Sequence, residues 1–363
     1  MALLAAGVVW PLCYFAFSSH PFIPRMPSVA TSIALLVFTI FSLASIYVSP
    51  IIWMSMGYVG MTLCALFIAL QFSTALTDKQ FQKGLAIYAI AMAMLLIIYA
   101  ISHYEPGLRL GNGVNGGVFN PNAIGLVSLS IVLSSLAIPK WWVRYMVLAL
   151  ALVILVLTGS RSASVGVVLA LSFVILKRTK QGGIGIKWAF VIGGVALSVI
   201  SMFFWNEIEA ILMNFFAVND AYRGIGSGAT GRMDAWIQTW GLFTSHPFFG
   251  VGFRAHDNLL HALVKTESSA HNGYLSLLAE IGLFGFAAVV VMVFSGVIRL
   301  LRAARDAENG LIAVILLGLC IGYGFMAIFE RYLLNVGNPT SLLFILAILY
   351  QGRKTVGDVS TAS

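Results

Sequence analysis

The sequence predicts an all-α polytopic membrane protein with about eleven transmembrane helices and one large external loop. The composition is the first observation, because 60% of the 363 residues are hydrophobic and only 9% are charged, far from the balance of a soluble domain. The second is the recurrence of apolar runs of roughly 15 to 25 residues, the length that a helix rising ~1.5 Å per residue needs to cross ~30 Å of hydrocarbon. The third is an uneven distribution of basic residues between the two sides of these runs.

Eleven apolar runs are long enough to be spans. They cover approximately residues 2–18, 28–48, 51–72, 84–103, 121–138, 142–158, 162–177, 188–205, 274–298, 311–329 and 338–350. The run at 2–18 has no positively charged segment before it and no convincing cleavage site, so we expect a retained span rather than a signal peptide. The cysteines, Cys13, Cys64 and Cys320, all lie within predicted spans, which favours buried apolar packing over a disulfide or a metal site.

Lys and Arg residues divide unevenly when the spans alternate in direction. Fourteen of the 21 fall on the side that carries the connection 177–187, and the positive-inside rule makes that side cytoplasmic. The external side keeps seven, namely Arg109, Arg161, Arg223, Arg232, Arg254, Lys265 and Arg331. The C-terminus is then cytoplasmic and the N-terminus external. The net charge of +8 follows from this topology and requires no nucleic-acid partner.

The spans divide the chain into four parts. We expect residues 1–205 to form an N-terminal bundle of about eight spans, 206–273 a large external loop with amphipathic helices, 274–350 a C-terminal bundle of about three spans, and 351–363 a short cytoplasmic tail. One stripe of apolar side chains in the loop recurs at three- and four-residue steps and predicts a short helix on the membrane surface. Its members are Met233, Trp236, Ile237, Trp240 and Phe243.

A polar group stands at the external entry of the span at 274–298. His271 and Asn272 precede the span and Glu280 lies inside it. On one helix, nine residues would put Glu280 about 180° around from His271 and about 13 Å deeper, so the two are not expected to pair. A carboxylate at that depth needs a partner, and Arg161 and Arg331 are the candidates. His271, with an ordinary pKa of about 6.5, is suited to accept a proton; the alternatives are an ordinary interfacial histidine and a purely structural Glu280.

Two external arginines are expected beside helix starts. Arg161 lies in LTGSRSASVG, between two spans, and Arg232 follows the glycine-rich SGATG. Free backbone N–H groups and the positive end of the helix dipole favour an anion at such places, and guanidinium groups bind phosphate in a bidentate manner. The pair predicts a phosphate or pyrophosphate clamp, although an arginine that only reaches toward lipid headgroups is the alternative for Arg161.

The run TGRMDAWIQTWGLFTSHPFFGVGF followed by AHNGYLSLLAEIGLFGF resembles the signature region of the O-antigen ligase and O-antigen and exopolysaccharide polymerase superfamily. These proteins are membrane glycosyltransferases of the bacterial inner membrane. The matching residues are Gly231, Arg232, Trp236, the turn 246–252, His271, Asn272, Leu275, Glu280 and Gly282. The segment GSRSA around Arg161, and Asn120, Pro121 and Asn122 at the entry of an earlier span, resemble the family as well.

The resemblance implies a GT-C-type helical fold with the active site facing the periplasm. The expected reaction transfers a saccharide from an undecaprenyl-pyrophosphate carrier to a sugar hydroxyl, with lipid A–core as the acceptor of a ligase. His271 is then the expected general base, Arg161 and Arg232 hold the pyrophosphate with weaker help from Arg254, and Asn272, Tyr274 and Glu280 support them. No cofactor or metal is expected; the external loops carry no Asp-X-Asp pair, and the sequence has no His-Glu cluster with metal-ligand spacing.

Ligases and polymerases share these motifs. A ligase-like transfer is our first reading, and a polymerase of exopolysaccharide, capsule or O-antigen repeat units is the first alternative. A multi-span transporter or flippase is the second, but it would be expected to carry polar groups at the middle of several spans. An intramembrane protease built on Ser162 and His271 is the weakest, because the glycine context of such a serine is missing.

Overall fold

The computed structural model describes residues 25–105, 108–111, 120–181, 232–264, 269–305, 310–336 and 339–352. Within these ranges the chain forms eleven helices and no strand. They are α2 (Val29–Val48), α3 (Ile52–Ala75), α4 (Asp78–His103), α5 (Pro121–Ser135), α6 (Trp141–Thr158), α7 (Arg161–Gln181), α10 (Arg232–Ser245), α11 (His256–Val264), α12 (Gly273–Ala303), α13 (Gly310–Met326) and α14 (Pro339–Leu349). The spans predicted at 2–18 and 188–205 lie outside the described residues.

Helix starts are set by capping side chains. Ser28 caps α2, Asn120 caps α5 ahead of Pro121 at its first position, and Thr77 forms a capping box with Gln80 at α4. The capping box explains why α4 begins at Asp78, six residues before the predicted span at 84. The first turn of α4 is polar, so hydropathy does not predict it, but the cap makes it helical.

The chain is a polytopic membrane protein, as predicted. Five helices, α2, α3, α4, α6 and α12, are long and apolar enough to cross a bilayer. The shorter apolar helices α5 and α13 are buried along nearly their whole length, so they form the centre of the bundle. Exposed apolar side chains such as Leu36 on α2 and Ile98 on α4 face outward, as lipid contact requires.

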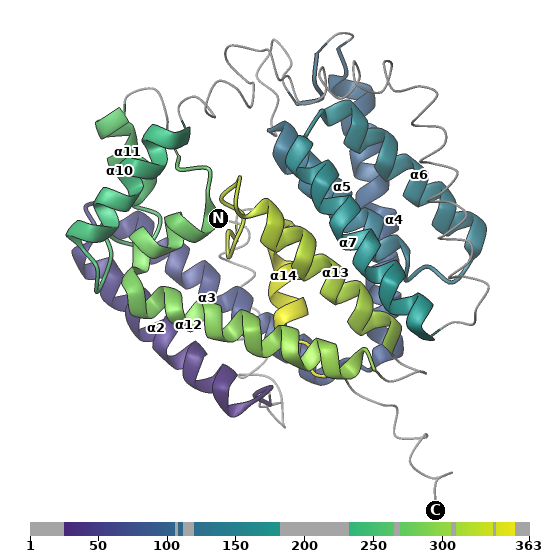
Figure 1. Ribbon diagram of the computed structural model, residues 1–363, viewed down its shortest axis with the longest axis horizontal. Coiled ribbons are helices and arrows are strands. Elements are labelled where there is room, and N and C mark those ends of the chain that lie inside the picture. Colours follow the sequence, from purple (N-terminus) through teal and green to yellow (C-terminus); the bar gives the residue numbers. More distant parts are fainter. Residues whose placement is uncertain are drawn as a thin grey trace, which may run out of the picture.

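Segments far apart in the sequence lie side by side (Figure 1). The most extensive helix pairs join α12 with α2, α13 with α7 and α5 with α6. In Figure 1, α2, α3, α10, α11 and α12 form one side of the molecule, α4 to α7 form the other, and α13 and α14 lie between them. The two groups of helices therefore meet around α13 and α14 (Figure 1), where a site built from both groups can form.

Polar contacts gather at the two ends of the bundle. At one end the Arg299 guanidinium donates to the Thr31 and Ser295 hydroxyls and to the Ile348 carbonyl, which ties α12, α2 and α14 together. At the opposite end the Gly273 N–H donates to the Ala327 carbonyl at 2.7 Å, joining the start of α12 to the turn after α13. The candidate site stands at this second end.

Candidate functional site

The centre of the site is Glu330, which follows α13. Its side chain is only 5% exposed. One carboxylate oxygen, Oε1, accepts a hydrogen bond from the Asn122 amide and lies 3.5 Å from Arg232 Nη2, while Oε2 lies 3.2 Å from His271 Nδ1. The three partners come from the first turn of α5, the first residue of α10 and the residue before the cap of α12. Four segments thus converge on one buried carboxylate.

His271 lies outside α12, in a backbone conformation with φ 46°. The helix begins at Gly273 and is capped by Asn272, whose Oδ1 accepts from the Tyr274 and Leu275 N–H groups. The prediction that His271 and Glu280 lie on one helix is therefore wrong, because the chain turns at His271 before α12 begins at Gly273. The two residues have different partners all the same. The left-handed φ directs the imidazole toward Glu330, away from the axis of α12.

Asn272 and Tyr274 support the site through the backbone. Asn272 caps α12. The Tyr274 hydroxyl donates to the Gly324 carbonyl on α13 at 2.8 Å. Asn272 thus fixes where α12 begins and Tyr274 holds that start against α13, next to His271.

Glu280 lies in a second cluster and is fully buried. It pairs with Arg331, one of the two partners that the sequence proposes, and with His256, whose Nδ1 lies 2.6 Å from Glu280 Oε1. The Ser276 hydroxyl lies 3.0 Å from His256 Nε2. Burial disfavours the charged imidazole, but the Glu280 carboxylate outweighs that effect and raises the pKa of His256 above its ordinary value. Buried charges at this depth are compensated by one another, as the membrane environment requires.

The turn between α10 and α11 fits into a break in α12. At Gly282 the helix departs from helical geometry, with φ 70° and ψ −176°. The Leu283 N–H donates to the Pro247 carbonyl, and the Ala279 and Glu280 carbonyls accept from Val251 and Gly252. The turn thus bonds the backbone N–H and C=O groups that lose their helical partners at the break. Without these bonds, the break would be a costly defect in a buried helix.

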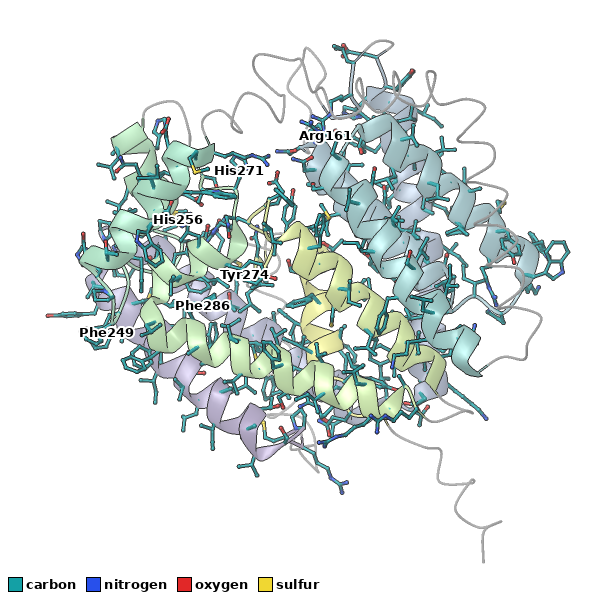
Figure 2. The ribbon with its side chains drawn as sticks, viewed as in Figure 1. Arg161, Phe249, His256, His271, Tyr274 and Phe286 are labelled. Carbon is teal, nitrogen blue, oxygen red and sulfur yellow. The ribbon has the colours of Figure 1, made fainter. Side chains whose placement is uncertain are left out.

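The two predicted arginines are the first residues of two different helices. Arg232 is the first residue of α10 and lies against Glu330. Arg161 is the first residue of α7, directly after Ser160, whose hydroxyl donates to Asn122 Oδ1 at 2.9 Å. Figure 2 shows Arg161 and His271 at the same end of the molecule. Both arginines therefore lie next to residues that contact Asn122.

Arg254 occupies the second cluster instead. Its guanidinium lies 3.7 Å from Asp257 Oδ2 and 4.8 Å from the centre of the Tyr58 ring. Arg331 also reaches Asp257, at 3.5 Å. The geometry gives Arg254 a role in holding α11 against α3, and its predicted part in pyrophosphate binding stays a prediction.

Three site residues were not assigned a role by the sequence reasoning. Glu330 stands beside Arg331 at the external end of a predicted span, which was the signal available for it. Arg109 donates from Nε to the Thr158 carbonyl at 2.7 Å and lies 3.5 Å from Asn122 Oδ1, so a third arginine borders the site. His256 was visible only as one of several loop histidines, because its partner Glu280 is 24 residues away in the chain.

The helix α10 matches the predicted amphipathic helix at Met233–Phe243. Met233, Ile237 and Trp240 are exposed, and Ala235 and Thr239 form its buried face. The Trp236 indole donates to the Ala270 carbonyl at 2.7 Å, which fixes α10 beside the residue that precedes His271. The exposed stripe leaves an apolar surface at the end of the molecule where the site lies, as a helix at the bilayer surface would.

The comparisons with known proteins agree with this picture. A family model described as O-antigen ligase matches residues 146–290. The match covers Arg161, Arg232, Arg254, His271 and Glu280. No curated protein matches the chain at a significant level.

Proposed function

We propose that this chain, whose residues 146–290 match a family model described as O-antigen ligase, belongs to that superfamily and is a glycosyltransferase of the bacterial inner membrane. It transfers a saccharide from an undecaprenyl-pyrophosphate carrier to a sugar hydroxyl, with lipid A–core as the acceptor. The fold is of the GT-C type, and the end that carries His271 faces the periplasm.

The observation that carries the proposal is the convergence on Glu330. His271 and Arg232 contact its two carboxylate oxygens, and Asn122 links the carboxylate to Ser160, beside Arg161. A group that accepts a proton and groups that stabilise a phosphate anion thus lie at one end of the bundle, on elements that start or end there. A transferase with a lipid-pyrophosphate donor needs both.

The chemistry follows from these roles. The acceptor hydroxyl oxygen attacks the anomeric carbon of the donor, and its proton passes to His271 as the new C–O bond forms. The bond from the anomeric carbon to the phosphate oxygen breaks, and its electron pair leaves with undecaprenyl pyrophosphate. Arg161 and Arg232 stabilise the charge that develops on that leaving group through charge-assisted hydrogen bonds. In-line attack gives inversion at the anomeric carbon.

Polymerisation of repeat units is the second candidate, because the shared motifs give both reactions the same machinery. The difference lies in the acceptor alone. A ligase accepts lipid A–core, and a polymerase accepts a second lipid-linked unit or the growing chain. Offering both acceptors to the same preparation distinguishes the two.

The test is transfer by the purified protein in liposomes, from a lipid-pyrophosphate-linked oligosaccharide to either acceptor. His271→Ala is expected to lower the rate by about 10²- to 10⁴-fold, the usual contribution of a general base, and Arg161→Ala and Arg232→Ala to lower it as well. His261→Ala, at an exposed histidine of α11, and Arg302→Ala, at an exposed arginine of the opposite end, are the matched controls. Full transfer by His271→Ala would rule out the general base, and transfer that depends on added divalent metal would rule out the arginine clamp.

A further inference from the structure

Glu330 is a buried carboxylate with three partners and no position in a regular helix. Its side chain is 5% exposed, whereas that of His271 is 28% exposed and that of Arg232 is 32% exposed. Burying a carboxylate costs several kcal/mol unless charges and hydrogen bonds compensate it. The compensation here comes from groups that are themselves open to solvent. A substrate can therefore reach His271 more easily than Glu330, so Glu330 can influence a reaction chiefly by its contact with His271.

The two oxygens of Glu330 serve different partners. Oε2 contacts His271 alone among the contacts described, and Oε1 accepts from Asn122 and faces Arg232. Asn122 is in turn fixed, since its Oδ1 accepts from the Ser160 hydroxyl. A chain of hydrogen bonds from the start of α7 through the start of α5 therefore sets the orientation of the carboxylate. Asn122 and Arg232 thus hold Glu330 through Oε1, and Oε2 is left to accept from the His271 imidazole.

We propose that Glu330 is the positioning residue of the general base. The inference rests on the proposed function and adds a residue to it. By accepting the hydrogen bond of Nδ1–H, Glu330 selects the tautomer in which Nε2 carries the lone pair, and it stabilises the imidazolium that forms when Nε2 takes the proton of the acceptor hydroxyl. The carboxylate itself neither touches the substrate nor takes the proton.

The kinetic test is Glu330→Gln, which keeps the size and removes the charge. We expect kcat to fall by about 10- to 100-fold with a smaller change in KM, and the acid limb of the pH profile of kcat/KM to move to lower pH, because His271 loses its anionic neighbour. Among the described residues, Arg232 faces Glu330, Tyr332 lies near both, and Arg161 and Arg109 border the site; all of them are retained. Glu330→Asp should restore part of kcat.

The matched control is Asp234→Asn, which removes a carboxylate from an exposed position on α10. It should leave both kcat and the acid limb unchanged. If Glu330→Gln lowers the melting temperature and leaves the acid limb in place, the residue is only structural and the proposal fails. If Asp234→Asn moves the acid limb equally, a general charge effect explains the shift and the proposal fails too.

A second measurement separates this inference from the proposed function. In protein carrying ¹⁵N-histidine, the His271 resonance, assigned by its absence in His271→Gln, reports the tautomer directly. The wild type should show the Nδ1–H form, and Glu330→Gln should shift the resonance toward a mixture. Loss of the Nδ1–H form supports the positioning role even if the wild type transfers no saccharide, in which case the proposed function fails alone. An unchanged resonance overturns the positioning role even where transfer is observed.

Discussion

Two histidines of this protein each lie against a buried glutamate, yet their surroundings suit opposite tasks. The His256 side chain is 0% exposed and contacts Glu280, Ser276 and Asp257. The His271 side chain is 28% exposed over its glutamate. A substrate hydroxyl can approach only an imidazole that is open to it, so exposure favours His271 for the proposed chemical role and His256 for a structural one.

The His256 cluster predicts a specific pH dependence of stability. The pKa of His256 is raised in the folded protein above its ordinary value of 6.5, so protonation favours the folded state. This contribution is complete below pH 6.5, the value expected in the unfolded chain, and is lost as the pH rises through the higher pKa of the folded state. The melting temperature of the wild type in detergent should therefore fall as the pH is raised above 6.5.

Two variants check this assignment. His256→Gln should be less stable than the wild type at low pH and should lose most of the fall in melting temperature between pH 6.5 and 9. His261→Gln, on the same helix at an exposed position, should follow the wild type throughout. A pH dependence that persists in His256→Gln would assign the effect to another group.

At the scale of elements, the junction of α12 with the turn that precedes α11 is the most constrained part of the fold. Gly250 has φ 70° and Gly282 has φ 70°, a region that disfavours residues with a Cβ. A Cβ at Gly282 would overlap the Phe248 carbonyl, and one at Gly250 would overlap the Glu280 backbone. The turn and the break fit together only because both positions are glycine. Their contact also sets the depth of Glu280 in the bundle.

Gly282→Ala is therefore expected to destabilise the protein by at least about 2 kcal/mol, since the positive φ and the overlap with Phe248 both oppose it. Gly241→Ala on α10 is the control, because a Cβ there meets nothing within 4 Å. Melting temperatures of the two variants in the same detergent give the comparison. Equal melting temperatures would show that the break in α12 is not required for the fold.

The elements differ in how far the sequence could predict them. Nine predicted spans correspond to described helices, because apolar runs of this kind predict helices, and five of the nine are long and apolar enough to cross a membrane. The start of α4 was misplaced, since the Thr77 cap lies in a polar segment. The break at Gly282 was not foreseen, because its backbone groups are satisfied by a turn whose residues lie 28 to 36 positions earlier in the chain.

The candidate site divides in the same way. His271, Arg161 and Arg232 were identifiable from local motifs. Glu330 and the pairing of Glu280 with Arg331 depend on contacts between residues that are 59 and 51 positions apart. Hydrophobic periodicity carries no information on which polar groups meet at such distances, so the sequence left two candidate partners for Glu280 and assigned no role to Glu330.

At the scale of the whole molecule, charge follows the direction of the helices. The candidate site occupies the end of the molecule at which three helices finish (α4, α6 and α13) and three begin (α5, α7 and α12). The described basic residues near the other end include Arg25, Lys79, Lys83, Lys140, Arg144, Lys177, Arg178, Arg299, Arg302 and Arg305. By the positive-inside rule we propose that the end with these basic residues faces the cytoplasm, and that α10, with its exposed Met233, Ile237 and Trp240, lies at the opposite surface of the bilayer.

This orientation predicts which positions react from outside a cell or spheroplast. Cysteines introduced by Asp234→Cys, on α10 two residues after the Arg232 that contacts Glu330, and by Arg302→Cys, near the end of α12, occupy exposed positions at the two ends of the molecule. A membrane-impermeant thiol reagent should label Asp234→Cys in intact spheroplasts and Arg302→Cys only after the membrane is permeabilised. The unsubstituted chain gives the background from its own three cysteines. Labelling of Arg302→Cys in intact spheroplasts would invert the orientation and place His271 in the cytoplasm, where an acceptor on the outer face could not reach it.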